Sequence, residues 1–179
     1  MTDDPNKVLD VPDVSRVTTD LPRSVKVAIA DSIIALSRME VAAESLIWAL
    51  TGMDPATGRL LTAMDARPKF SVTRTLLTRK IPKLTSQTLP ADFWEKLSEL
   101  RDCRNEIVHG VWVMLDNSIP FAISYRTKDH RGVIGSAYAR DRLAAIASMA
   151  DIMGRHFDRL EDAFRAQQEA SRAQPVSPK

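Results

Sequence analysis

The stretch RDCRNEIVHG, residues 101–110, marks the point at which the chain changes from helical to extended patterning. A helical pattern runs up to it from about residue 91, and Gly110 stands where helices commonly end. Beyond it, two apolar runs at 111–115 and 121–126 flank a turn at Asp116–Asn117, which predicts a β-hairpin. Residues 132–138 predict a third short strand. The stretch therefore separates a helical region from a small β element.

Apolar residues at spacings of three and four predict further helices on both sides of this stretch. A long first helix is expected over 23–50, ended by Thr51-Gly52. Two shorter helices are expected over 56–64 and 69–79, with Pro82 as the stop and a polar loop at 83–89. The last helix has the most regular apolar stripe, made by Leu143, Ile146, Ala150, Met153, Phe157, Leu160 and Phe164.

These elements predict an all-α fold, a helical bundle with a small β-hairpin inserted before the last long helix. The domain organisation follows from the same pattern. Residues 1–22, with three prolines, read as an irregular leader. Residues 23–166 form a single helical domain with the hairpin at about 111–126, and residues 167–179 read as a frayed tail. A length of 179 residues favours one core over two.

Composition is that of an ordinary globular protein, with 44% hydrophobic and 27% charged residues. The formal net charge is +2, so binding to nucleic acid requires a local basic patch. Arg74, Arg79, Lys80 and Lys83 form one such run, although a solvated helix face is the default reading. The single cysteine, Cys103, and the acidic N-terminal residues predict a cytoplasmic protein without a membrane span.

One charge is out of place on the predicted helix 91–109. On a helical wheel, Arg104 falls among Phe93, Leu97, Leu100, Ile107 and Val108, whereas Asp102, Asn105 and His109 share a neighbouring polar stripe. A buried guanidinium requires a partner. The first helix offers Glu40 within its own apolar stripe and Glu44 at the edge, which predicts a Glu40–Arg104 or Glu44–Arg104 pair. Such a pair either sets helix register or positions Arg104 at the floor of a polar cleft.

Arg104-Asn105-Glu106-Ile107-Val108-His109 resembles R-N-x-x-x-H, the signature of the HEPN superfamily of helical-bundle proteins. The long first helix with an inward carboxylate and the closing amphipathic helix are similar to the same superfamily. The resemblance covers roughly residues 23–165, and six of them are diagnostic. Many members are ribonucleases of toxin–antitoxin and antiviral systems, and others bind RNA, nucleotides or proteins without cutting.

The resemblance implies catalytic roles for Arg104, Asn105 and His109, with Glu40, Glu44 and Asp102 as supporting residues. In metal-independent RNA cleavage, His109 would transfer protons and Arg104 would stabilise the charge on phosphorus. Asn105 would orient the imidazole or hold a phosphate oxygen. The resemblance also implies a homodimer that joins two such motifs, with RNA as the ligand and an antitoxin or another protein as a further partner.

Other candidates are few. Trp112, directly after the motif, is the aromatic residue expected to contact a substrate. Three scattered histidines and one cysteine predict no metal site, and no cofactor is expected. The leading functional hypothesis is RNA binding or metal-independent endoribonuclease activity, in a toxin or defence setting. The alternative is a non-catalytic interaction module that binds a partner protein or a nucleotide, so the sequence leaves open whether the chain is an enzyme.

Overall fold

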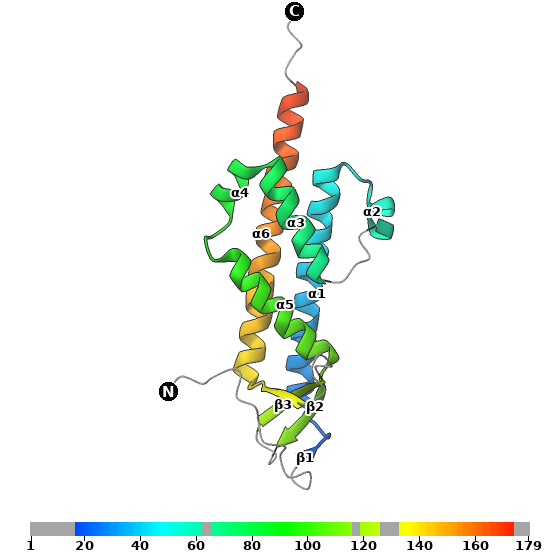
Figure 1. Cartoon of the computed structure of the whole chain (residues 1–179), viewed down its shortest axis with the longest axis vertical. Helices are drawn as coiled ribbons and strands as arrows, with labels where there is room; N and C mark the ends of the chain where they lie inside the picture. The colour runs from blue at the N-terminus through cyan, green and yellow to red at the C-terminus, as the bar shows by residue number, and fades with distance from the viewer. Residues whose placement is uncertain (1–16, 62–65, 116–118, 126–132, 174–179) are drawn as a thin grey trace, which may run out of the picture. The chain divides into compact units, whose positions relative to one another are not determined.

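A computed structural model describes residues 17–61, 66–115, 119–125 and 133–173. The chain is mostly helical with a small antiparallel sheet before the last long helix, which confirms the predicted fold class (Figure 1). Its residues divide into two compact units. Unit 1 comprises residues 1–35 and 99–149, and unit 2 comprises residues 36–98 and 150–179. Helices α1 (Arg23–Thr51), α5 (Phe93–His109) and α6 (Arg140–Ala173) contribute residues to both units.

Helix α1, Arg23–Thr51, matches the predicted first helix. It ends because Gly52 adopts a φ of 72°, a left-handed conformation that glycine adopts without steric cost. The Met53 N–H then donates to the Trp48 carbonyl at 3.0 Å, which satisfies a carbonyl group of the last turn. The Lys80 ammonium donates to the Leu50 carbonyl at 2.5 Å and closes the same helix end.

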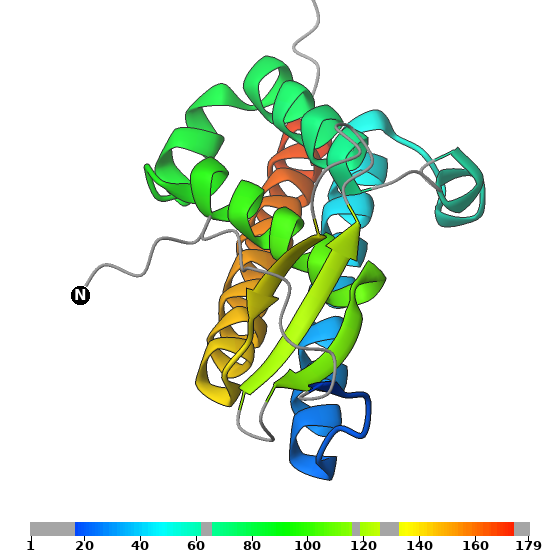
Figure 2. The same cartoon turned by 60° about the horizontal axis from the view of Figure 1, so that its bottom comes forward.

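Unit 1 contains a four-stranded antiparallel sheet of β1 (Val17–Thr18), β2 (Val111–Leu115), β3 (Ile119–Tyr125) and β4 (Val133–Ala137), in that spatial order (Figure 2). The predicted hairpin and third strand are therefore present. The second strand begins earlier than predicted, because Ile119 pairs with Leu115. The predicted turn at Asp116–Asn117 lies outside the described residues. Strand β1 falls in the predicted irregular leader, where its pairing with Met114 and Leu115 makes it extended.

Helical segments of unit 1 pack through both apolar and polar contacts. The Ser32 side chain is fully buried, and its hydroxyl lies 2.8 Å from the Ala28 carbonyl and 3.0 Å from that of Leu143. The contact with Ala28 lies within α1, and the contact with Leu143 joins α1 to α6 inside the unit. The largest buried side chains of unit 1 are those of Val25, Leu100, Ile107, Val113, Met114, Tyr138, Leu143 and Ile146.

Unit 2 contains the three short helices α2 (Pro55–Leu61), α3 (Ala66–Lys80) and α4 (Pro82–Thr88). Its core is aromatic. Phe93 is fully buried, with its ring centroid 5.1 Å from that of Trp94 and 5.3 Å from that of Phe157, both edge-to-face. The prediction of a loop over 83–89 is wrong, because Pro82 begins α4 instead of only ending α3. The Thr85 hydroxyl fixes α4 by donating to the Ile81 carbonyl at 2.8 Å.

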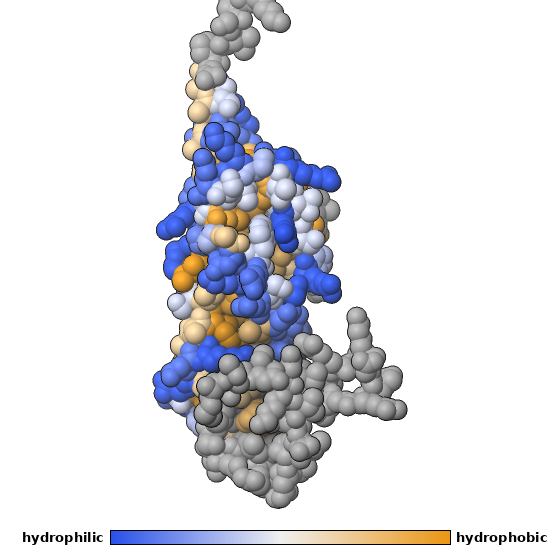
Figure 3. All heavy atoms as spheres, turned by 60° about the vertical axis from the view of Figure 1, so that its left-hand side comes forward, coloured by the Kyte–Doolittle hydropathy of each residue, from blue (hydrophilic) through white to orange (hydrophobic). Residues whose placement is uncertain are grey.

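Helix α6, Arg140–Ala173, continues beyond the expected start of the frayed tail at residue 167. On the coloured part of the surface in Figure 3, hydrophilic residues predominate, with apolar patches between them. In the part of the chain that the structure describes, every helix is too short or too polar to cross a bilayer.

Candidate functional site

Helix α5, Phe93–His109, carries the R-N-x-x-x-H motif in its last two turns. The helix ends where predicted. The Gly110 N–H donates to the Glu106 carbonyl at 2.8 Å, and the chain then enters β2. Glycine is required here because a Cβ at position 110 would meet the Glu106 carbonyl and the Ala122 side chain of β3. The motif therefore lies between a helix end and a sheet, and both restrict its backbone.

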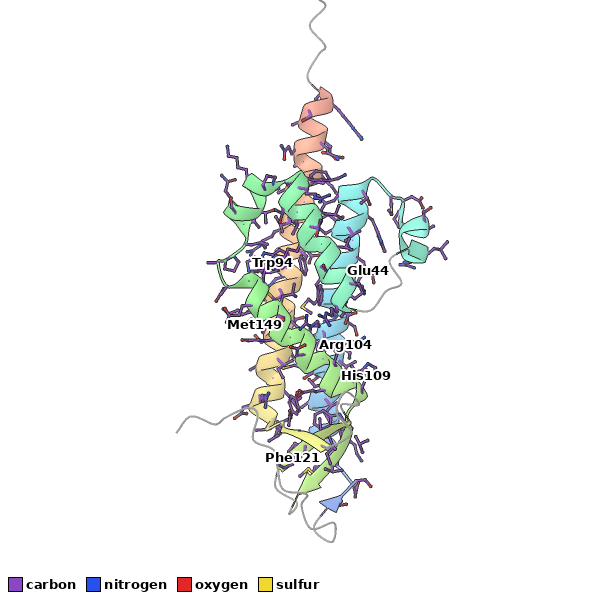
Figure 4. All side chains as sticks on the ribbon, in the orientation of Figure 1. Glu44, Trp94, Arg104, His109, Phe121 and Met149 are labelled. Carbon is purple, nitrogen blue, oxygen red and sulfur yellow. The ribbon has the colours of Figure 1, made fainter. Side chains whose placement is uncertain are left out.

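Arg104, Asn105 and His109 come together on this helix end. The Arg104 Nη1 atom lies 3.3 Å from His109 Nε2 and 3.4 Å from Asn105 Oδ1. Both distances fall within hydrogen-bond range, so the arginine and the histidine are direct neighbours (Figure 4). With Arg104 as the donor, His109 Nε2 acts as the acceptor, which places the proton of the neutral ring on Nδ1.

The exposure of the motif differs from the wheel argument in two ways. Arg104 is half-buried, whereas Asn105 and His109 are exposed. Val108, which the wheel places on the buried side, is 39% exposed, while Ile107 is buried. The last turn therefore presents His109 and Val108 to solvent. An external ligand has direct access to the imidazole and to the edge of the guanidinium.

A buried tyrosine forms a hydrogen bond with Glu106, a residue within the motif. Tyr138, at the end of β4 and fully buried, donates from its hydroxyl to Glu106 Oε2 at 2.6 Å. Burial and this hydrogen bond raise the pKa of the Tyr138 phenol, so it stays protonated and acts as a donor at neutral pH. The Arg142 guanidinium lies 4.5 Å from the centroid of the Tyr138 ring. Burial also raises the pKa of the neighbouring Cys103 thiol, which is not an activated nucleophile.

We predict that Tyr138→Phe lowers the free energy of unfolding by about 1.5–3 kcal/mol, because it removes a hydrogen bond to a half-buried carboxylate. Urea denaturation followed by circular dichroism measures the loss. Glu106→Gln in the Tyr138→Phe background should recover part of it, since a neutral amide needs its donor less than a carboxylate does. Equal stability of Tyr138→Phe and wild type would contradict a stabilising hydrogen bond between Tyr138 and Glu106.

Trp112, in strand β2, contacts the same helix end. Its indole Nε1 donates to the Ile107 carbonyl at 3.0 Å, and its ring centroid lies 5.4 Å from that of Tyr138. The N–H group is therefore already used to cap a carbonyl of the last helical turn. Its predicted contact with a substrate stays a prediction, and any such contact would use the exposed part of the ring.

The predicted supporting carboxylates each have a cationic side chain close by within their own unit. Lys69 of α3 is buried, and its ammonium lies 3.2 Å from Glu40 Oε2 and 2.5 Å from Glu44 Oε1. Asp102 accepts two hydrogen bonds from its neighbour Arg101, at 2.8 and 3.0 Å. The proposed Glu40–Arg104 or Glu44–Arg104 pair joins residues of different units and stays a prediction.

Sequence reasoning missed Lys69 and Tyr138. A signal for Lys69 was present, since it shares the buried side of α3 with Ala66, Phe70, Thr73 and Leu77 at helical spacing. It is the cation that the inward-facing carboxylates of α1 require. Tyr138 had no comparable signal, because its contact with Glu106 spans 32 residues and depends on the position of β4.

The site contains groups suited to acid–base and electrostatic chemistry. An imidazole is a common general acid or base, and the adjacent guanidinium can hold two oxygens of a phosphate. Across the described residues, histidine, cysteine and carboxylate side chains form no cluster of three or more that could hold a metal ion.

Comparison with models of protein families, with curated proteins and with solved structures gives no match for this chain.

Proposed function

We propose that this chain is a HEPN-like RNA-binding protein that cleaves RNA without a metal ion, with Arg104, Asn105 and His109 as its active site. The observation that carries the proposal is the 3.3 Å contact between Arg104 Nη1 and His109 Nε2 at an exposed helix end. A cation and a titratable base at this distance can act on the same phosphodiester.

In the proposed reaction, the Arg104 guanidinium turns from His109 to the bound phosphate. The freed Nε2 atom of His109 accepts the proton of a ribose 2′-hydroxyl while the 2′-oxygen attacks the adjacent phosphorus. Arg104 donates to the non-bridging oxygens, whose negative charge increases in the pentacoordinate transition state. Asn105 keeps the guanidinium in place through its Oδ1 atom. The bond between phosphorus and the 5′-oxygen then breaks, and the products are a 2′,3′-cyclic phosphate and a 5′-hydroxyl.

The departing 5′-oxygen needs a proton, and one imidazole that has just accepted a proton is poorly placed to act on the opposite side of the phosphorus. A second copy of the chain supplies this acid through its own His109. The proposal therefore includes a homodimer with two apposed motifs. A toxin or defence role in the cytoplasm, with a protein antitoxin as a partner, belongs to the same proposal.

The test is digestion of several structured and unstructured RNAs in EDTA by wild type, His109→Ala and Arg104→Ala. The wild type should leave cyclic phosphate ends, and each substitution should reduce the rate at least about a hundredfold, the lower range for general acid–base catalysis. RNA with a single deoxyribose at the cleavage position should resist cutting there, because it lacks the nucleophile.

Arg101→Ala is the matched control, since it removes the same charge from the same helix and leaves the motif intact. Arg104→Lys tests whether the guanidinium fork matters beyond its charge. All variants must show the circular dichroism spectrum and melting temperature of a folded protein. Equal cleavage by wild type and His109→Ala, or no cleavage of any RNA, would overturn the catalytic proposal and favour the non-catalytic interaction module.

A further inference from the structure

The charged residues of this chain are unevenly distributed. Residues 66–91 contain six lysines and arginines and not one aspartate or glutamate, while the remaining 153 residues contain 19 basic and 23 acidic side chains. Helix α6 shows the usual arrangement, with six arginines and six acidic residues. Helices α3 and α4 therefore hold a concentrated positive charge in a protein whose net charge is only +2.

Most of this charge lies on the surface. Lys69 is the exception, because it is buried and neutralised by Glu40 and Glu44. We define the basic face as the exposed cations of the two helices whose charged groups form neither an ion pair nor a hydrogen bond with a described residue, namely Arg67, Arg74, Arg79 and Lys83. Lys80 is left out because its ammonium donates to the Leu50 carbonyl. Arg67 and Arg74 are two turns apart on the exposed side of α3. Arg79 and Lys83 lie on either side of the junction with α4.

Between these cations the surface carries hydroxyl groups in place of carboxylates. Thr75 and Thr78 of α3 donate to the Ser71 and Arg74 carbonyls at 3.0 and 2.9 Å. Ser86 of α4 donates to the Lys83 carbonyl at 2.9 Å. These side chains neither repel an anion nor neutralise the arginines, so the positive potential of the face is not offset locally.

Arg74 has a fixed position on this face. Its guanidinium lies 5.4 Å from the centroid of the Trp94 ring, and Trp94 is itself held edge-to-face against the buried Phe93. A guanidinium held by an aromatic ring has lost little of its hydrogen-bonding capacity and can still donate to phosphate oxygens.

We propose that the basic face binds the sugar-phosphate backbone of single-stranded RNA. Four unneutralised cations match a polyanion, and a fixed guanidinium beside an aromatic ring is typical of surfaces that hold single strands. A lipid surface fits less well, because Val72, 36% exposed, is the only large exposed apolar side chain described on α3 and α4, and interfacial helices insert a broad apolar side.

This inference depends on the proposed function for its choice of RNA, but it concerns binding at residues that take no part in cleavage. The two can therefore fail separately. A chain that cuts RNA at His109 without using the basic face would overturn only the inference. A chain that binds RNA through the basic face and never cuts would overturn only the catalytic proposal.

The test measures binding of a fluorescein-labelled, fully 2′-O-methylated single-stranded RNA of 20 nucleotides by fluorescence anisotropy. This probe cannot be cleaved, because its 2′-oxygens are blocked. The test variant replaces three exposed cations of the face by glutamine: Arg67→Gln, Arg79→Gln and Lys83→Gln. The control variant removes the same net charge from exposed positions of α6: Arg140→Gln, Arg165→Gln and Arg172→Gln.

The basic-face variant should bind at least tenfold more weakly than wild type at 0.1 M salt, and the control variant within about threefold. The slope of log Kd against log salt concentration should fall by about 2, since each single-strand phosphate contact contributes about 0.7. Equal weakening by both triple variants, or none by either, would overturn the proposal. So would loss of binding to phosphatidylserine vesicles or to polyglutamate in the basic-face variant while RNA binding is unchanged.

Discussion

Replacing Lys69 by methionine is expected to lower the free energy of unfolding by about 3–5 kcal/mol, the range for breaking a buried ion pair. The ammonium lies within 3.2 Å of Glu40 and 2.5 Å of Glu44, and all three side chains are less than one-fifth exposed. Without the cation, two carboxylates remain close together in a poorly hydrated position, where their repulsion is weakly screened. Urea denaturation at pH 7 measures the loss.

Two controls separate this cause from a simple packing defect. Lys96→Met breaks the exposed pair with Asp92 and should have little effect on stability. Adding Glu40→Gln and Glu44→Gln to Lys69→Met should restore much of the lost stability, because the repulsion is then absent. A stability change below about 1 kcal/mol for Lys69→Met would contradict this prediction. It would show that Lys69, Glu40 and Glu44 are well hydrated and that their ion pairs contribute as little as exposed ones.

Phe93→Ala should cost a similar amount, about 3–5 kcal/mol, through the cavity that it leaves. The ring is fully buried and contacts Trp94, His156 and Phe157 edge-to-face, with centroid distances of 5.1, 5.7 and 5.3 Å. Neighbouring rings lose these interactions as well as apolar burial. Thermal and urea denaturation both report the change.

Leu60→Ala provides the comparison for Phe93→Ala. Leu60 is 83% exposed, so its truncation should change the free energy of unfolding by less than about 0.5 kcal/mol. Phe93→Leu should lie between the two, since it keeps most of the apolar volume and loses the ring contacts. If Phe93→Ala and Leu60→Ala had equal effects, the aromatic cluster would not form the core of unit 2.

Periodicity alone was sufficient to predict much of the fold. The apolar stripes of α1, α5 and α6 and the two apolar runs after Gly110 all correspond to observed elements. Helix α4 was missed because its sequence, PKLTSQT, has one apolar residue and begins with a proline. Strand β1 was missed because two residues become extended only through pairing with Met114 and Leu115, almost 100 positions away.

The part of the candidate site that lies on a single helix was predictable from the sequence. Arg104, Asn105 and His109 are at most five positions apart, so helical geometry brings them together wherever α5 lies. The contacts that hold this helix end are different, since Tyr138 directly follows β4 and Trp112 belongs to β2, so their partners depend on how the sheet is paired. For Glu40 and Glu44, the sequence predicted Arg104 as the partner, which stays a prediction, and the structure places Lys69 beside both carboxylates.

The division of the chain into two units has a consequence for how the protein is made. Unit 1 needs residues 1–35 together with 99–149, and unit 2 needs residues 36–98 together with the segment that begins at 150. The segment up to residue 98 therefore contains neither unit whole when it leaves the ribosome. Aromatic residues such as Phe70 and Phe93 stay without Phe157 until α6 emerges. The nascent chain exposes these surfaces until residue 157 has been synthesised, a period in which chaperone binding or aggregation competes with folding.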